Sequence, residues 1–335
     1  MDFVDPSSFH HRTELLATGK RYHFVDELPK NYDPDITKTI ICIHGFPDLW
    51  YGWRHQIPHW RDAGYRVVAP DMLGYGGTDK PGDIPDYGLK SLSSDIAALL
   101  DFLQVKKAIV VGHDWGAATV WRFALYFPER VLALAIMSVP FYPPAANYAS
   151  LEDITKVIVN YGYQLYFADP ASTKEIEDNL ENFLAMIFVR PYGMEAFTRV
   201  GQLRDLLLHH QDRIKKSEIV QTPKEFAFYL EQFTTNGMGG PLSYYKTTDQ
   251  RFKEEKESNL QPNVSSSFPV LFMWGSKDAS CPKQAVDSIH KYIPRLTKIK
   301  LEGKGHWVLV EAQDAVTSNI LDFIEKELKG NQSKL

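Results

Sequence analysis

The chain has 335 residues, of which 44% are hydrophobic and 24% charged, the balance of an ordinary globular enzyme. A formal net charge of −5 with no basic stripe argues against a nucleic-acid partner. The chain has only two cysteines, which excludes a disulfide framework, and no apolar run reaches the length of a membrane span or, within residues 1–12, of an export signal.

Eight short segments have the residue pattern of β-strands, and helical segments alternate with most of them. Most of these strands are continuous apolar runs, which favours parallel strands covered by helices on both faces. We therefore predict an α/β fold with a mostly parallel eight-stranded sheet. Its expected strands are residues 14–17, 22–27, 39–43, 66–70, 108–111, 132–138, 270–274 and 297–301.

A helical unit is predicted between the sixth and seventh strands. Pro140, Pro143 and Pro144 mark the point where the chain leaves the sheet, and the residues from there to Lys246 are helical in pattern and rich in Tyr, Phe and Leu. We assign residues 1–140 and 247–335 to a core domain and residues 141–246 to a cap domain. A cap of this kind would cover the pocket and exclude water.

The first candidate site is the loop His44, Gly45, Phe46 and Pro47, directly after the strand at 39–43. This loop can aim the backbone N–H of Phe46 at a negatively charged oxygen that forms during a reaction. The N–H of Trp115 would be the second donor of this oxyanion hole.

Asp114 is placed on a sharp turn between the strand at 108–111 and a helix at 117–126 that ends before Pro128. Gly112 and Gly116 flank this turn, as expected where a strand and a helix cross too closely for a Cβ atom. Many enzymes with a strand–turn–helix nucleophile have a serine here, and this chain has no Gly-x-Ser-x-Gly. Asp114 is therefore a candidate nucleophile, with a helix N-cap as the alternative.

Two later loops carry the groups that such a nucleophile needs. Asp278 follows the strand at 270–274, and His306 lies on a glycine-rich loop after the strand at 297–301. Nucleophilic catalysis of this type needs a histidine base and an acid that orients it. The order of nucleophile, acid and histidine is that of α/β-hydrolases, so we predict the triad Asp114, Asp278 and His306.

In these ordered motifs the chain resembles soluble epoxide hydrolases of the α/β-hydrolase fold over about residues 12–327. It is most similar to the microbial and fungal type, with one catalytic domain and no N-terminal phosphatase domain. The resemblance implies hydrolysis of an epoxide, which is an ether, to a vicinal diol through an ester on Asp114. Water activated by His306 and Asp278 would cleave this ester, whereas a serine would form an ether that water cannot cleave.

The resemblance also implies that Tyr163 and Tyr245 in the cap hydrogen-bond the epoxide oxygen. The residue pattern alone does not select this pair, because tyrosine at helical spacing more often packs in a core. The chain has 17 tyrosines, and Tyr161, Tyr166 and Tyr244 are close neighbours of the two.

We expect Phe46, Pro47, Trp115 and Trp307 to line the substrate pocket. One alternative function is haloalkane dehalogenation, in which side-chain N–H donors hold the halide. Trp115 would be one donor, but Phe46 stands where such enzymes have an asparagine. The other alternative is a non-catalytic ligand receptor on the same fold, which would not need the full triad.

No cofactor and no metal are expected. His55 and His59 have the i, i+4 spacing of metal ligands, but Pro58 interrupts them and no third ligand is evident. Substrate and water are therefore the expected small-molecule partners.

Ser333, Lys334 and Leu335 match the C-terminal address of peroxisomal proteins. A peroxisomal import receptor is the partner that this match implies, and the expected location is the peroxisome, the cytoplasm or both. A fluorescent protein fused in front of the chain should form puncta that disperse when Leu335 is deleted.

Overall fold

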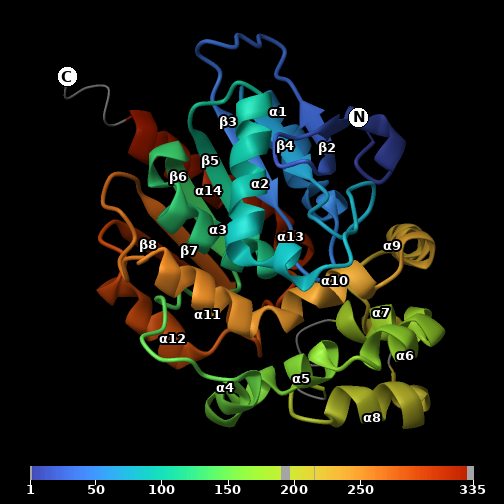
Figure 1. The fold of residues 1–335 in the computed structure, drawn as a ribbon. Helices are drawn as coiled ribbons and strands as arrows, with labels where there is room; N and C mark the ends of the chain where they lie inside the picture. The colour runs from blue at the N-terminus through green and yellow to red at the C-terminus, as the bar shows by residue number, and fades with distance from the viewer. Residues whose placement is uncertain (1, 190–196, 215, 330–335) are drawn as a thin grey trace.

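A computed structural model describes residues 2–189, 197–214 and 216–329, and an eight-stranded sheet forms its centre (Figure 1). The strand order is β1-β2-β4-β3-β5-β6-β7-β8, in which β3 to β8 are parallel, and the β1–β2 and β2–β4 pairs are antiparallel. The predicted α/β architecture is confirmed. The strands are β1 (His11–Leu15), β2 (Arg21–Glu27), β3 (Thr39–Ile43), β4 (Arg66–Pro70), β5 (Ala108–His113), β6 (Val131–Met137), β7 (Val270–Gly275) and β8 (Leu296–Leu301).

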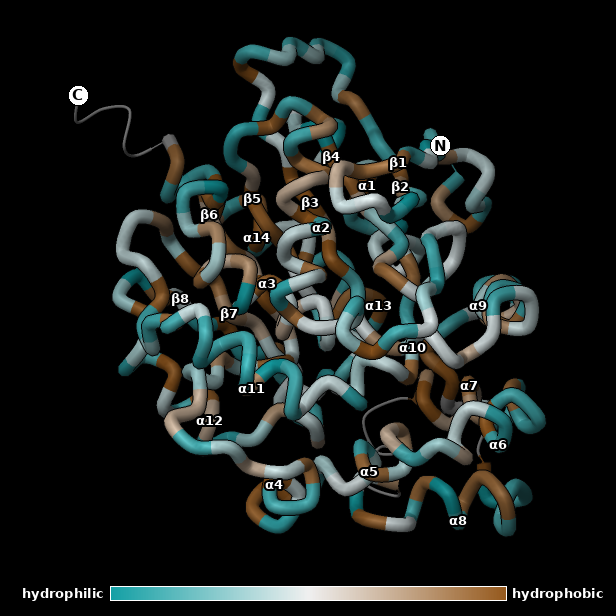
Figure 2. Tube along the Cα trace, viewed as in Figure 1, coloured by the Kyte–Doolittle hydropathy of each residue, from teal (hydrophilic) through white to brown (hydrophobic). Residues whose placement is uncertain are grey.

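The central strands are buried along their whole length, as the continuous apolar runs predict. Every residue of β3, β4 and β5 is buried, whereas β1 and β8 at the two edges are largely exposed. Figure 2 shows this contrast as hydrophobic strands inside a more hydrophilic outer layer. A strand covered on both faces needs no alternation, so its sequence is apolar throughout.

Strand β1 begins three residues earlier than the expected segment 14–17 and ends two residues earlier. The Leu16 N–H donates to the Lys20 carbonyl at 2.9 Å, and Gly19 has a φ of +81°. This tight turn removes Leu16 and Ala17 from the strand, because the chain must reverse there for Leu15 to pair with Arg21.

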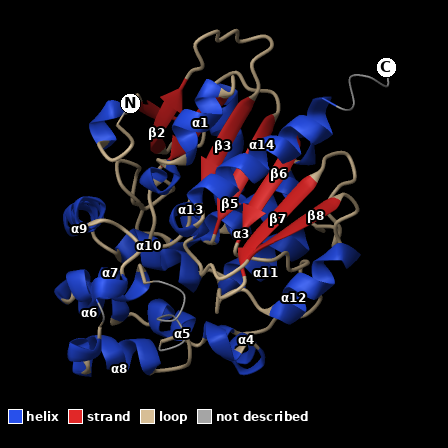
Figure 3. Cartoon of the chain, turned by 180° about the vertical axis from the view of Figure 1, so that it is seen from behind, coloured by secondary structure: helices blue, strands red, loops and turns tan. Residues whose placement is uncertain are grey.

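Helices cover both faces of the sheet, as expected (Figures 1 and 3). Helices α2 and α3 pack together on one face, and α1 and α14 pack together on the other. None of the helices within the described ranges is both long and apolar enough to cross a membrane. The helices outside the cap segment are α1 (Gln56–Asp62), α2 (Leu89–Phe102), α3 (Trp115–Tyr126), α11 (Thr248–Glu257), α12 (Lys283–Ser288), α13 (Val308–Glu311) and α14 (Gln313–Lys329).

The segment between β6 and β7 forms a helical layer beyond one end of the strands (Figures 1 and 3). We call residues 141–246 the cap segment. The domain limits themselves stay a prediction. The helices of the cap segment are α4 (Leu151–Val157), α5 (Tyr163–Ala168), α6 (Ser172–Asp178), α7 (Leu180–Ile187), α8 (Gln202–His209), α9 (Pro223–Asn236) and α10 (Gly239–Ser243).

Candidate active site

Asp114 lies at the turn between β5 and α3, in a backbone conformation that side chains rarely adopt. Its φ of 54° and ψ of −122° lie outside the broad allowed regions, so the surrounding structure must hold them in place. A Cβ atom on Gly116 would lie 2.0 Å from the Ile43 carbonyl oxygen, and one on Gly112 would lie 2.7 Å from the Gly116 carbonyl oxygen. The two glycines therefore let β3, β5 and α3 approach closely enough to form the turn.

The Asp114 side chain faces the loop after β3. Its Oδ1 accepts a hydrogen bond from the backbone N–H of Phe46 at 2.7 Å, and it makes no capping bond to α3. Asp114 thus occupies the N-cap position of α3, but its side chain does not cap the helix. A Cβ atom on Gly45 would lie 2.6 Å from the Trp115 nitrogen, so the loop after β3 and the turn at Asp114 are in close contact. The two predicted oxyanion donors, the N–H groups of Phe46 and Trp115, belong to these two segments.

His306 lies between the two carboxylates of the predicted triad. Its Nδ1 is 2.9 Å from Asp278 Oδ2, and its Nε2 is 3.4 Å from Asp114 Oδ2. All three side chains are buried. Asp114 and Asp278 are 164 positions apart in the sequence, and Asp278 and His306 are 28 positions apart. The fold thus brings three distant residues together.

Burial opposes the charged form of each of these groups, but their mutual attraction outweighs it. Burial is the largest influence on Asp114 and raises its pKa, yet the hydrogen bond and charge of His306 bring that pKa below its ordinary value. The pKa of Asp278 is also lowered, by His306 and Ser280 against burial. For His306, burial lowers the pKa, but Asp278 and Asp114 together raise it to about 10. The resting site is therefore an imidazolium between two carboxylates.

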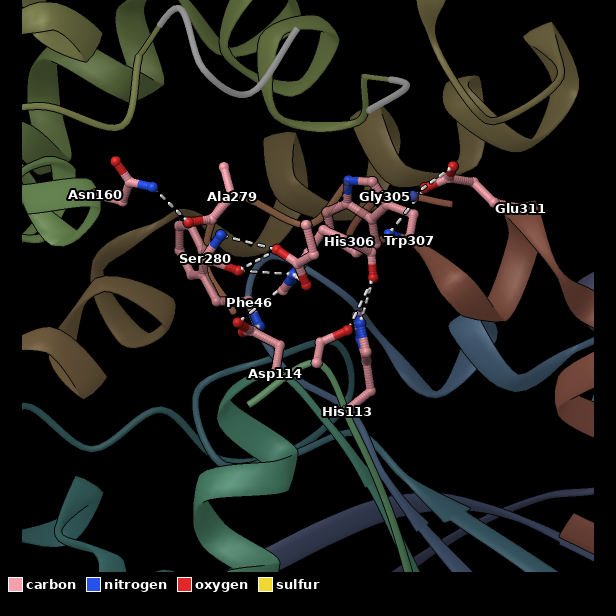
Figure 4. Close-up of polar contacts among 12 residues, drawn as sticks. Phe46, His113, Asp114, Asn160, Ala279, Ser280, Gly305, His306, Trp307 and Glu311 are labelled. Atoms are coloured by element: carbon pink, nitrogen blue, oxygen red, sulfur yellow. Dashed lines mark hydrogen bonds and ion pairs between the residues drawn. The ribbon is translucent and has the colours of Figure 1, made fainter. Parts of the chain in front are cut away.

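Residues that the sequence analysis did not single out hold the acid and the histidine in place (Figure 4). Ser280 Oγ donates to Asp278 Oδ1 at 2.6 Å and lies 3.0 Å from His306 Nδ1. On the other side, His113 Nε2 and Ser138 Oγ contact the His306 carbonyl oxygen at 2.8 Å and 3.2 Å. Ser280 could have been found from the sequence, because a serine two residues after an aspartate often bonds to its carboxylate. Nothing in the sequence connects Ser138 with residue 306.

Glu311 supports the histidine loop from the first turn of α13. Its two carboxylate oxygens accept hydrogen bonds from the backbone N–H groups of Gly305 and Trp307 at 3.0 Å and 3.2 Å (Figure 4). These two N–H groups bracket His306. The carboxylate therefore fixes the backbone on both sides of the residue that carries the imidazole.

Tyr163 and Tyr245 both lie beside Asp114, within one aromatic cluster. Their ring centroids are 6.4 Å apart, and the Tyr245 ring contacts Phe46 and Trp115 edge-on. Burial, followed by the negative charge of Asp114, raises the pKa of both hydroxyls. Both tyrosines therefore keep their protons at neutral pH and are available as hydrogen-bond donors.

The neighbouring tyrosines point to other partners. The Tyr244 hydroxyl donates to the Leu73 carbonyl at 2.9 Å, and the Tyr161 hydroxyl lies 3.2 Å from that of Tyr142. Tyr166 is absent from the walls of both cavities described below. Tyr161 also lines the larger cavity, but its hydroxyl contacts that of Tyr142, so the hydroxyl contacts separate residues that the sequence pattern could not.

Two cavities meet at Asp114. The larger, of about 350 Å³, includes Asp114, Trp115, Tyr163, Tyr245 and Ser280 in its wall. The smaller, of about 30 Å³, is bounded by aromatic residues and by His306. Together the two cavities reach a carboxylate, two hydroxyls and an imidazole, and the larger one has the size for a small organic substrate.

The four expected pocket residues are distributed unevenly. Trp115 lines the large cavity, whereas Phe46 and Trp307 line the small one. Pro47 is not among the described residues that line either cavity. Trp307 also connects two regions of the molecule, because its indole N–H donates to the carbonyl of Ile187 in the cap segment at 2.9 Å.

His55 and His59 do not converge on a common point as metal ligands would. His59 Nδ1 lies 2.8 Å from the His55 carbonyl oxygen, and His55 Nε2 lies 3.8 Å from Glu225. Among the residues that the structure describes, no group of three or more His, Cys, Asp or Glu side chains could hold a metal ion.

Comparison with known proteins places this geometry in a family. Residues 38–313 match the family model of the alpha/beta hydrolase fold. Epoxide hydrolase A of Mycobacterium tuberculosis is 33% identical over 85% of this chain and 90% of its own length. The bifunctional epoxide hydrolase 2 of Mus musculus is 30% identical over 97% of this chain, which spans 57% of that longer protein. The crystal structure of epoxide hydrolase A from Mycobacterium thermoresistibile superposes with a TM-score of 0.80, at 30% identity, over 94% of this chain and 98% of that one.

Proposed function

This chain belongs to the epoxide hydrolases of the α/β-hydrolase fold family, and from that premise we propose that it opens epoxides to vicinal diols through a covalent ester on Asp114. The observation that carries the proposal is the arrangement around one cavity. The Asp114 carboxylate lies in its wall, and the hydroxyls of Tyr163 and Tyr245, which are both neutral, lie beside it. An epoxide between them would meet a nucleophile on its carbon and proton donors on its oxygen.

In the first half-reaction, an Asp114 oxygen forms a bond to an epoxide carbon as the bond from that carbon to the ring oxygen breaks. The electron pair of the broken bond goes to the ring oxygen, which takes a proton from one of the tyrosines. Asp114 is already ionised because its pKa is low, so it needs no base to become a nucleophile. The product is a neutral ester on Asp114 that carries a β-hydroxyl group.

Ester formation changes the charge around His306. The negative charge of Asp114 helps to raise the pKa of His306 to about 10, and it disappears when the ester forms. We infer that the pKa of His306 then falls, so that the imidazolium returns a proton to the tyrosinate and becomes a neutral base. The same residue is thus acidic before alkylation and basic after it.

In the second half-reaction, neutral His306 takes a proton from water as the water oxygen attacks the ester carbonyl of Asp114. Asp278 holds the imidazole at 2.9 Å and stabilises the positive charge that forms. The carbonyl oxygen that becomes negative is the atom that the Phe46 N–H already contacts, at 2.7 Å. Collapse of the intermediate expels the diol oxygen, which takes a proton from His306. The Asp114 carboxyl group then returns a proton to His306, and the resting ion pair forms again.

A single-turnover experiment in heavy-oxygen water tests this proposal. With styrene oxide as substrate, the label should appear first in the Asp114 carboxylate, because water attacks the ester carbonyl. Label that appears first in the diol, with Asp114 unlabelled, would mean that water opens the epoxide directly. Turnover of a chlorinated alkane in place of styrene oxide would identify a dehalogenase, and turnover of neither would identify a receptor.

Import into the peroxisome by a receptor for Ser333, Lys334 and Leu335 remains a prediction, because these three residues lie outside those that the structure describes.

A further inference from the structure

Two side-chain hydrogen bonds join the cap segment to the loops that carry the acid and the base of the triad. Asn160 Nδ2 donates to the carbonyl of Ala279, the residue after Asp278, at 2.9 Å (Figure 4). The Trp307 indole N–H donates to the Ile187 carbonyl, also at 2.9 Å. Ile187 is the last residue of α7, which carries neither of the two cavity tyrosines, whereas the Asn160 bond lies close to one of them.

Asn160 lies three residues before Tyr163 on a continuous stretch of the cap segment. It belongs to the 3-10 helix η5 (Val159–Tyr161), and Tyr163 is the first residue of α5. Tyr163 and Ser280 each line both cavities, and Ser280 directly follows the residue that Asn160 contacts. The bond therefore crosses from the cap segment to the core at the cavity wall, beside a tyrosine that donates to the epoxide oxygen.

The core end of this bond is held firmly in a turn at residues 278–281, which we call the acid loop. Asp278 Oδ1 accepts hydrogen bonds from the backbone N–H of Ser280 at 2.9 Å and from its hydroxyl at 2.6 Å. Asp278 Oδ2 is 2.9 Å from His306 Nδ1, and the Cys281 N–H donates to the Asp278 carbonyl at 3.2 Å. Ala279 lies inside this closed turn, so its carbonyl is a fixed point to which the cap segment can be attached.

Tyr163 itself, among the residues that the structure describes, is hydrogen-bonded only within the cap segment. Its backbone N–H donates to the Thr198 carbonyl at 3.0 Å, and its hydroxyl meets the Gln164 amide at 3.5 Å. Its ring packs edge-on against Phe167, with the ring centroids 5.5 Å apart. All three contacts move with the cap segment, so they do not fix the hydroxyl relative to Asp114.

We propose that Asn160 is a positioning residue, which places the Tyr163 hydroxyl relative to Asp114 by tying the start of α5 to the acid loop. The inference rests on the proposed function, since it concerns a donor of the alkylation step. A displacement of about 1 Å between reacting groups can lower a rate by about a hundredfold. Because the acid loop is fixed by its own bonds, loss of the tie displaces Tyr163 and leaves Asp278 and His306 in place. Asn160 thus acts on alkylation and not on hydrolysis of the ester.

The test uses Asn160→Leu, which removes the amide at nearly the same volume, and Asn160→Gln, which keeps an N–H donor. In single turnovers of styrene oxide, Asn160→Leu should slow ester formation by about threefold to thirtyfold, within the range of about tenfold to a hundredfold expected for the Tyr163 hydroxyl itself. Hydrolysis of an ester already formed should stay within about twofold of the wild-type rate. Asn160→Gln should recover part of the alkylation rate.

The matched control is Asn236→Leu, which should change neither rate. The Asn236 amide is also half-buried and also donates to a backbone carbonyl at 2.9 Å, but its partner is Gln232 in the same cap helix, α9. Its loss therefore removes an equivalent bond from the cap segment without cutting a tie to the core.

Double variants separate positioning from a general loss of structure. In a Tyr163→Phe background, Asn160→Leu should slow alkylation no further, because no hydroxyl is left to position. In a Tyr245→Phe background, the slowing should persist. Equal slowing in both backgrounds, or an equal slowing of ester hydrolysis, would show that Asn160 only supports the fold and would overturn the inference.

Crystal structures provide a readout that needs no catalysis. Compared with the wild type, Asn160→Leu should show the Tyr163 hydroxyl displaced from Asp114, with Asp278 and His306 unmoved, and an unchanged Tyr163 would overturn the inference. Ester formation by the wild-type enzyme keeps the two proposals apart, because its presence with an equal rate in Asn160→Leu contradicts only the role of Asn160. If the wild type forms no ester, the proposed function fails, and the crystal structures still decide whether Asn160 holds Tyr163 in place.

Discussion

The two sides of the active site are built on different physical principles. On the core side, Asp114, His306 and Asp278 form a chain of opposite charges, and backbone N–H groups and the Ser280 hydroxyl hold the two carboxylates. On the cap side, Tyr163 and Tyr245 lie among aromatic rings. The only hydrogen bond among described residues to the Tyr163 hydroxyl is a long one of 3.5 Å, from Gln164.

This difference matches the two half-reactions. The core side must hold charge in one arrangement while water attacks, so it needs donors that are already in place. The cap side must bind a different substrate oxygen in each turnover, and the hydroxyl groups of Tyr163 and Tyr245 keep the protons that they would donate to it. The comparison teaches that the core side governs ester hydrolysis and the cap side governs alkylation, and the four predictions below test this division.

The largest effect is expected from His306→Gln, which removes the base of the second half-reaction and leaves the nucleophile intact. Steady-state turnover should fall by about a hundredfold to ten-thousandfold, while alkylation still occurs. Mass spectrometry should show the intact protein heavier by one substrate molecule, with the adduct on the Asp114 peptide. The matched control is Asp114→Asn combined with His306→Gln, which should form no adduct. Absence of the adduct in His306→Gln itself would show that the core side also controls alkylation.

The next effect is expected from Tyr163→Phe and Tyr245→Phe, which remove one donor each from the cap side. Each should slow single-turnover alkylation by about tenfold to a hundredfold, and the double variant should be nearly inactive. Hydrolysis of an ester already formed should keep its wild-type rate. Tyr166→Phe, three residues further along α5, is the control, because Tyr166 lines neither cavity. Wild-type alkylation rates in both single variants would contradict the assignment.

The charge chain also predicts how stability changes with pH. The folded-state pKa of His306, about 10, is above its ordinary value of 6.5, so the folded protein keeps a proton that the unfolded chain has lost between these two pH values. Its stabilising contribution is therefore complete below about pH 6.5 and is lost as the pH rises toward 10. One linked proton lowers the free energy of unfolding by at most about 1.4 kcal/mol per pH unit. Urea unfolding of the wild type should show a steeper loss over this window than that of His306→Gln, and parallel curves would mean that His306 is neutral in the resting enzyme.

The smallest effect on rate is expected from Trp307→Phe, which removes the indole N–H that joins the histidine loop to the cap segment. The buried Ile187 carbonyl loses its partner, so the free energy of unfolding should fall by about 1 to 3 kcal/mol. Both half-reactions should slow only a few-fold, because no group that touches the substrate oxygen or the ester is removed. Thermal unfolding and single-turnover kinetics measure the two effects. A large loss confined to one half-reaction would show that Trp307 belongs to one side of the site.

The sequence predicted the core side well, because its signals are local. Gly112 and Gly116 around Asp114, and the position of each functional residue in a loop or turn after a strand, depend on neighbours in the chain. Parallel strands end at the same edge of the sheet, so loops that are distant in sequence meet there. The same reasoning placed β1 wrongly, because the pairing of Leu15 with Arg21 depends on a turn at residues 16–20 that apolar pattern does not reveal.

By itself, the sequence determined the α/β architecture, the strand–turn–helix at Asp114 and the order of nucleophile, acid and histidine, since each follows from residues close together in the chain. The tertiary structure decided which tyrosines lie beside Asp114, that Pro47 is absent from the described cavity walls, that Ser138 contacts the backbone of residue 306, and that Arg122 pairs with Glu255. These outcomes depend on how helices of the cap segment and α11 pack against the sheet. Packing brings together residues that are more than a hundred positions apart in the sequence. The order of neighbouring residues along the chain does not show which of these distant residues will be in contact.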